Sequence, residues 1–141
     1  MSIQAILLPL FVQVTLTFVL YCWMAYHRVS LIRRGEVHPR DVALRQPNWP
    51  PHVLQVANAA HNQLETPVLF YVLTILTIIT RHADLLFVVM AWIFVLLRLW
   101  HAYIHVTSNR ITRRGSVFGL ALLDLMLMWL IFIVRILLGL P

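Results

Sequence analysis

The sequence predicts an all-α integral membrane protein, folded as a four-helix bundle with up-down connections. Of its 141 residues, 61% are hydrophobic and only 11% are charged. A soluble domain of this size cannot bury so much apolar surface, whereas a lipid bilayer solvates it. The apolar residues also fall into four runs, each long enough to cross a hydrocarbon core of about 30 Å.

Polar or helix-breaking segments separate the four expected spans. The first run has no basic leader and no small-residue cleavage site, so we expect a retained helix rather than a signal peptide. The first loop ends in Gln-Pro-Asn-Trp-Pro-Pro, a strong helix-breaking signal. The expected spans are residues 3–26, 52–80, 85–106 and 117–138, joined by a polar loop at 27–51, a tight turn at 81–84 and a basic loop at 107–116. We find no repeat or internal boundary and therefore expect one domain over residues 1–141.

Charge predicts how the bundle is oriented. All eleven basic residues are arginines, and the net charge is +6. The first loop has five arginines against two acidic residues, the third has three arginines and no acid, and the second is nearly neutral. By the positive-inside rule, loops one and three face the cytoplasm and both termini lie on the other side. Nucleic-acid binding is disfavoured, because most arginines lie in the gaps between apolar runs.

The single cysteine, Cys22, lies in the first span. One cysteine excludes a disulfide framework within the chain. We expect it to be a buried small hydrophobic residue rather than a reactive thiol.

Polar residues gather on one face of each middle span. The second span has Asn58, Asn62 and Glu65 at i, i+4 and i+7, flanked by His61, and the third has Arg98, His101 and His105 at i, i+3 and i+7. Such spacing predicts a shared helix face. A charge at bilayer depth costs about 2.5–3.5 kcal/mol, so the two faces should point at each other or at water. Polar residues can simply join helices, but ionisable ones at this depth more often indicate function.

We expect Glu65 and Arg98 to form an ion pair, because both lie near the middle of antiparallel spans. Asp124 is a third buried charge, in the fourth span. Its partner is expected to be an arginine or histidine of the third span or of another subunit.

Two ligand classes fit this cluster. Glu65 and the histidines could bind zinc or iron. The second span has no Glu-x-x-His or His-x-x-x-His pair, however, and Arg98 repels a cation. A small acid or zwitterion fits better, because Arg98, the histidines and the third-loop arginines form a positive cleft. Taken alone, Arg113 and Arg114 are better explained by topology and lipid head-group contact.

Two segments resemble signatures of the MAPEG family, the membrane-associated proteins in eicosanoid and glutathione metabolism. They are Asn-Ala-Ala-His-Asn-Gln-Leu-Glu-Thr-Pro-Val-Leu-Phe-Tyr at residues 58–71, and Arg-Leu-Trp-His-Ala-Tyr-Ile-His at residues 98–105 followed by Ser-Asn-Arg-Ile-Thr-Arg-Arg at residues 108–114. The resemblance, to the bacterial type, covers nearly the whole chain. It implies a homotrimer in the bacterial inner membrane with active sites between subunits. Glutathione, the co-substrate, would enter from the cytoplasm, and a lipophilic electrophile or hydroperoxide would enter from the bilayer.

The resemblance also implies roles for individual residues. Glu65 would hold the glutathione amine, and Asn62 its backbone or a carboxylate. Arg114 would stabilise the thiolate, with Asp41 assisting from the first loop. The other implied glutathione contacts are Asn58, His61, Arg98, His101, His105, Arg110, Arg113 and Phe118.

Three positions depart from the glutathione-binding pattern. Asn58 and His61 stand where relatives often carry arginines, and Gly115 replaces a serine that can donate to sulfur. Bidentate arginine is hard to replace in carboxylate capture. The alternative is therefore a non-catalytic membrane scaffold or lipid-binding trimer with the same fold. The sequence does not choose among transferase, peroxidase and isomerase chemistry.

Overall fold

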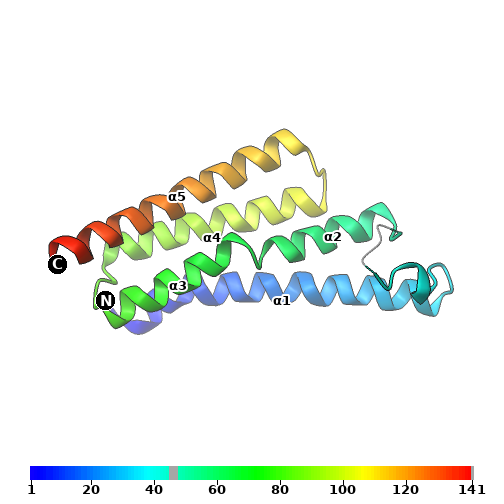
Figure 1. Cartoon of the computed structure of the whole chain (residues 1–141), viewed down its shortest axis with the longest axis horizontal. Helices are drawn as coiled ribbons and strands as arrows, with labels where there is room; N and C mark the ends of the chain where they lie inside the picture. The colour runs from blue at the N-terminus through cyan, green and yellow to red at the C-terminus, as the bar shows by residue number, and fades with distance from the viewer. Residues whose placement is uncertain (45–47, 141) are drawn as a thin grey trace.

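Four long helical segments lie side by side and account for most of the chain (Figure 1). The computed structural model describes residues 1–44 and 48–140, so Arg45 and the Gln-Pro pair of the expected first loop, and Pro141, lie outside the described residues. The elements are α1 (Ile3–Arg33), the short 3-10 helix η1 (Pro39–Asp41), α2 (Pro51–Asn62), α3 (Thr66–Ile79), α4 (Leu85–Val106) and α5 (Ile111–Leu138). With α2 and α3 taken as one segment, four segments are long and apolar enough to cross a membrane. The prediction of an all-α, four-helix bundle is confirmed.

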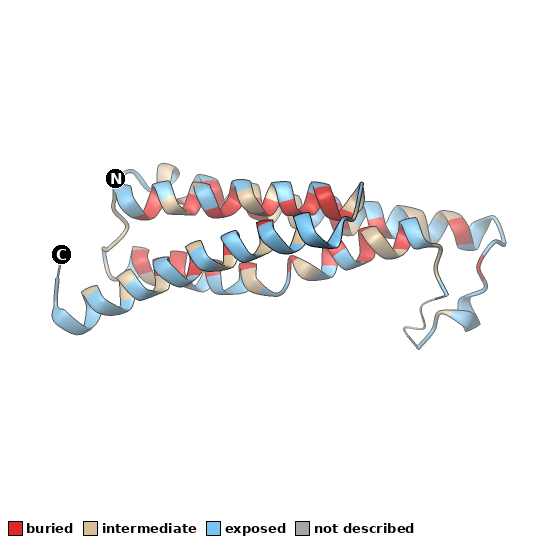
Figure 2. Ribbon diagram, turned by 90° about the horizontal axis from the view of Figure 1, so that it is seen from above, coloured by how far each residue is buried: buried red, intermediate tan, exposed pale blue. Residues whose placement is uncertain are grey.

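The connections place both termini at one end of the bundle, next to the α3–α4 turn (Figure 1). Helix α4 is central and contacts α1, α2 and α5. Buried residues form stripes along the helices, and exposed residues cover much of the rest of the bundle (Figure 2). Large apolar side chains such as Phe18 and Leu137 are among the exposed ones. In a bilayer such side chains contact lipid. Cys22 is also exposed on α1, so the expectation that it is buried was wrong.

The first helix is longer than the apolar run predicts. It continues past residue 26 to Arg33, so the polar segment expected at 27–51 begins as helix. Its end is set by Gly35, which adopts φ +72° and donates its amide to the Ile32 carbonyl. Glycine in the left-handed conformation is a common helix stop.

The second span is broken rather than continuous. Helix α2 ends at Asn62, and Glu65, just before α3, is non-helical at φ −95° and ψ −105°. Pro67 explains the break, because it lacks an amide proton and its ring collides with the carbonyl four residues earlier, that of Gln63. The single helix expected over 52–80 is corrected to two helices in line.

The last helix begins earlier than predicted. Helix α5 starts at Ile111, so Arg113 and Arg114 belong to its first turns and not to a loop over 107–116. Only residues 107–110 connect α4 to α5. No proline stands between Ile111 and the apolar run that follows, so nothing prevents the helix from starting here.

A buried polar layer joins α1, the α2–α3 break and α4. Gln13 of α1 is fully buried and donates its amide to Gln63 Oε1 at 2.9 Å. Gln63 is also fully buried and donates to the Ala59 carbonyl at 3.0 Å. The same Oε1 accepts from Arg98 Nη2 at 3.2 Å. Polar groups inside a bilayer need internal partners, so these bonds fix how the three segments pack.

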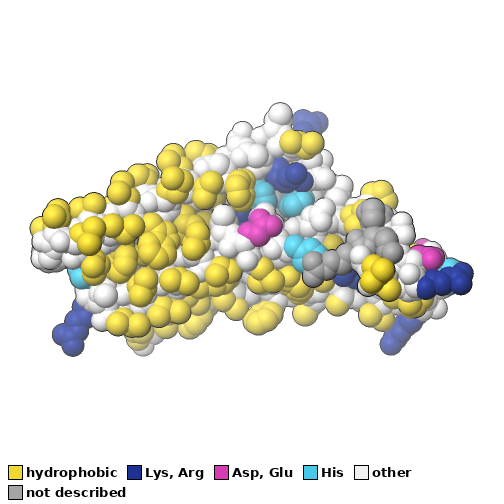
Figure 3. All heavy atoms as spheres, in the orientation of Figure 1, with side chains coloured by type: hydrophobic (Ala, Val, Ile, Leu, Met, Phe, Trp, Pro, Cys, Tyr) yellow, Lys and Arg dark blue, Asp and Glu magenta, His cyan; other side chains and the backbone are white. Residues whose placement is uncertain are grey.

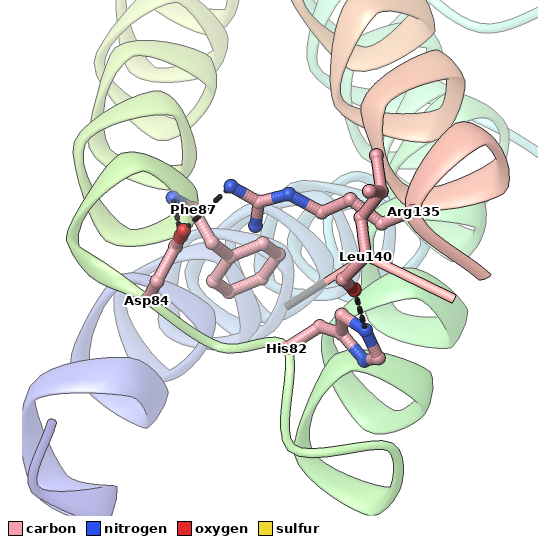
Figure 4. A network of polar contacts seen from close by, with 5 residues as sticks. All are labelled: His82, Asp84, Phe87, Arg135 and Leu140. Carbon is pink, nitrogen blue, oxygen red and sulfur yellow. Dashed lines mark hydrogen bonds and ion pairs between the residues drawn. The ribbon is translucent and has the colours of Figure 1, made fainter. Parts of the chain in front are cut away.

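A second polar network fastens the end of the bundle that carries the termini (Figure 4). Asp84 accepts from the Phe87 amide at 2.9 Å, which caps α4, and pairs with Arg135 of α5 at 2.8 Å. His82 Nε2 lies 3.0 Å from the Leu140 carbonyl oxygen. Burial opposes ionisation of Asp84, but the Phe87 amide and Arg135 outweigh it and lower the pKa of this carboxyl. The last turn of α5 is thereby tied to the α3–α4 turn.

Replacing Gln63 should destabilise the bundle more than replacing Gln13. In Gln13→Leu, Gln63 keeps Arg98 as a donor, so the loss is one interhelical hydrogen bond, worth about 0.6 kcal/mol in a membrane protein. In Gln63→Leu, both Gln13 and Arg98 lose a buried partner, which costs about 1–3 kcal/mol. Thermal unfolding of the two detergent-solubilised variants measures the difference. Equal melting temperatures would contradict the central place of Gln63.

The contribution of Asp84 to stability should disappear in acid. Asp84→Asn keeps an oxygen for the Phe87 amide but loses the charge that Arg135 faces, so the expected loss is about 0.5–1 kcal/mol for a half-exposed pair. Because the folded-state pKa lies below the ordinary 3.8, the contribution is fully present above that value and is lost as pH falls through the folded-state pKa. Melting temperatures of wild type and Asp84→Asn should differ near neutral pH and converge in acid. Curves that stay parallel down to the lowest pH would rule out this ionic contribution.

Candidate functional site

Arg98 is the charged centre of the site and is completely buried on α4. Its Nη2 donates to the Asn62 side-chain oxygen at 2.5 Å and to the Asn62 carbonyl oxygen at 3.2 Å. Because α2 ends here, that carbonyl has no partner four residues on within the helix. It accepts from the Glu65 amide at 3.4 Å as well as from Arg98. Nε and Nη1 of Arg98 are buried and have no hydrogen-bond partner in the described part of the chain. The acceptors that Arg98 has among those residues belong to Asn62 and Gln63, so all of them are neutral.

Asn62 stands between Arg98 and Glu65. Its Nδ2 donates to Glu65 Oε2 at 2.9 Å while its Oδ1 accepts from Arg98. No direct ion pair joins Glu65 to Arg98 among the described residues, so that expectation was wrong. The reason is the helix break, which brings Glu65 to Asn62 through a turn. Glu65 therefore does not continue the helix face on which Asn58 and Asn62 lie.

A cavity of about 270 Å³ lies beside this network, against the start of α5. It is lined by Asn62, His101, His105, Ile111, Arg114, Gly115 and Phe118. The two histidine rings are one helical turn apart, with centroids at 5.6 Å. Phe118 packs against His101 at 5.7 Å, and its ring lies 6.0 Å from the Arg98 guanidinium carbon. The walls thus combine aromatic rings, an amide and a cation.

The cation is Arg114, which is half-buried on α5. Its Nη1 donates to Asn109 Oδ1 at 2.5 Å. Within the described ranges it forms no ion pair with a carboxylate. A guanidinium that is held by a neutral amide keeps its charge for an incoming anion. We had not expected Asn109 at the site, although asparagine before a helix is a frequent left-handed turn residue.

Not every residue predicted for the site lines this cavity. The structure brings together Asn62, His101, His105, Arg114 and Phe118, with Arg98 directly behind them. The others are exposed outside the cavity: Asn58, His61, Glu65, Arg110, Arg113 and Asp41. Of these, Glu65 still reaches the site through Asn62. Asp41 lies in η1 and pairs with Arg40 at 3.7 Å.

Asp124 is half-buried on α5, and its Oδ2 is buried without a hydrogen-bond partner in the described part of the chain. The arginine or histidine partner expected from α4 is not among its contacts there. In the described ranges, no group of three or more His, Cys, Asp or Glu side chains is placed to hold a metal ion.

The polar site interrupts a largely apolar surface (Figure 3). On this face, hydrophobic side chains cover most of the half of the bundle that carries the termini, and basic and histidine side chains stand only at its lower edge. Acidic, histidine and arginine side chains gather near the middle and towards the opposite end. The site therefore lies at the boundary between the apolar half of the bundle and the end that carries the basic loops.

Residues 6–134 match the MAPEG family. No curated protein and no solved structure matches the chain at a significant level. The family match runs from α1 to α5 and includes every residue that lines the cavity. This multi-pass membrane protein therefore belongs to the MAPEG family.

Proposed function

We propose that the protein is a membrane-bound, glutathione-dependent transferase or peroxidase that acts on lipophilic electrophiles or hydroperoxides. Members of the MAPEG family are glutathione-dependent transferases or peroxidases, or are non-catalytic. The observation that carries the proposal is the cavity beside Arg114, whose guanidinium has no carboxylate partner among the described residues. A thiolate is an anion suited to that position.

In this mechanism Arg114 places its charge beside the sulfur of bound glutathione and lowers the pKa of the thiol. The thiolate then attacks an electrophilic carbon held at the bilayer edge of the cavity, and the leaving group departs with the electron pair of its bond. With a hydroperoxide it attacks the terminal oxygen instead: the O–O bond breaks, the alkoxide takes a proton to leave as the alcohol, and a second glutathione reduces the sulfenic acid to give the disulfide and water. Glu65 holds the glutathione amine, and Asn62, with the histidines, holds its peptide and carboxylate groups. Catalysis comes mostly from proximity and from stabilisation of negative charge.

The site belongs, in this proposal, to the interface of a homotrimer. Asn58 and His61 are exposed on α2 near the level of Arg98, where a single chain would present them to lipid. Polar and ionisable groups are unfavourable there, and a neighbouring copy would cover them. The same neighbour would be needed to bring Asp41 to the cavity, because Asp41 lies outside the cavity of its own chain.

We also propose that the arginine-rich end of the bundle faces the cytoplasm of a bacterial inner membrane, with both termini on the other side. The positive-inside rule supports this orientation. Glutathione would then reach the cavity from the cytoplasm, while an apolar second substrate would arrive through the bilayer.

A non-catalytic scaffold or lipid-binding trimer is the second candidate. Gly115 lines the cavity and offers no hydroxyl to a thiolate. Asn58 and His61 carry no guanidinium to clamp a carboxylate. If these departures decide the function, the cavity holds a different anion or none.

Glutathione should bind the purified protein with a dissociation constant of about 1 mM or tighter, a free energy of about −4 kcal/mol. Isothermal titration in detergent measures it directly. S-methylglutathione is the matched control, because it keeps both carboxylates but cannot form a thiolate, and it should bind more weakly. Absence of glutathione binding would support the scaffold instead.

Arg114→Ala should remove thiolate formation and lower turnover about 10²–10³-fold, because the charge beside the sulfur is lost. The ultraviolet absorbance of bound thiolate and steady-state rates with a hydroperoxide measure the two effects. Arg33→Ala is the control, since it removes the same charge from an exposed position on α1 outside the cavity. Unchanged thiolate absorbance in Arg114→Ala would refute the assignment of Arg114.

A further inference from the structure

Asn109, in the turn between α4 and α5, contacts Arg114 but does not line the cavity. Asn109 adopts φ +46°, in the left-handed region, and its backbone N–H donates to the Ile104 carbonyl oxygen at 2.8 Å. The same residue offers its side-chain Oδ1 to Arg114 Nη1. One residue therefore both shapes the four-residue turn and anchors the cation of the cavity.

The left-handed conformation limits which residues fit this position. Glycine adopts it freely, and asparagine and aspartate are the residues with side chains that adopt it most readily. Glycine here would leave Arg114 without its acceptor. Aspartate would accept the same hydrogen bond but would add a negative charge. Of the three, only asparagine holds the guanidinium and leaves its charge unbalanced.

The charged groups around Arg114 do not include an acid in direct contact with it among the described residues. The titratable and charged groups on the packed elements are His101 and His105 of α4, which line the cavity, and Arg98 behind them. The acid nearest in this network is Glu65, which is bonded to Asn62 and does not line the cavity. A carboxylate at position 109 would thus be the first acid in direct contact with Arg114 among the described residues.

We infer that Asn109 is a positioning residue that fixes the Arg114 guanidinium towards the cavity without neutralising it. This inference rests on the proposed function, since the anion that benefits is the glutathione thiolate. A cation that is already paired with a carboxylate stabilises a second anion less, because the two negative charges repel each other. The neutral anchor therefore sets how strongly the thiol is acidified.

Two substitutions separate position from charge. Asn109→Asp keeps the turn and the anchor but balances the charge of Arg114. It should raise the pH at which bound glutathione becomes thiolate by about one unit, which is about tenfold less thiolate at a fixed lower pH. Asn109→Gly keeps the turn and the charge but loses the anchor. It should shift that titration by less than half as much and lower turnover about three- to tenfold through poorer positioning.

The experiment is a thiolate absorbance titration of the trimeric wild type and both variants with bound glutathione, with steady-state rates and melting temperatures measured in parallel. A larger titration shift in Asn109→Asp than in Asn109→Gly, at similar melting temperatures, supports the inference. If bound glutathione titrates in Asn109→Asp at the same pH as in wild type, the inference is overturned. It is also overturned if the loss of turnover in both variants simply follows their loss of melting temperature. If Asn109→Asp does not fold, wild-type turnover in Asn109→Gly overturns the positioning role. A wild type that forms no thiolate overturns the proposed function, and this inference with it.

Discussion

The guanidinium of Arg98 is the constraint on which the arrangement of the bundle depends. It is completely buried in a helix that crosses the membrane, and among the described residues it has only amide and carbonyl acceptors. Those acceptors must come from other segments, because the carbonyls of an intact helix are already paired. The turn after Asn62 lets its carbonyl accept from Arg98 as well as from the Glu65 amide, and the buried side-chain amide of Gln63 supplies another acceptor. Gln13 completes the arrangement from α1.

The same preference for neutral partners continues at the cavity. Arg98 and Arg114 are both held by side-chain amides, those of Asn62 and Asn109, while the carboxylate of Glu65 is one amide further away. Amides fix direction without cancelling charge. The region beside Phe118 and the two histidines therefore stays positive, although the described chain has acidic residues on α5 and at the α2–α3 break.

Much of the fold was predictable, because hydropathy and length directly report four membrane-crossing segments. The deviations come from single residues that act locally. Gly35 and Pro67 were visible in the sequence as helix-stopping residues, and they explain the end of α1 and the division of the second span. The expected Glu65–Arg98 pair failed because of the same break in the second span. Helical periodicity assumes an unbroken helix, and it cannot show that an amide will stand between two charges. The contact of Arg135 with Asp84 depends on the register of α5 against α4, which no local pattern reports.

The length of α1 has a consequence for the two basic connections. Thirty-one residues in a helix span about 46 Å, well beyond a hydrocarbon core of about 30 Å. In Figure 1, helix α1 extends past the turn that joins α4 to α5, so its extra length lies at the end of the bundle away from the termini. The segment that follows α1 and the α4–α5 turn therefore stand at different levels along the bundle axis, although both are rich in arginine.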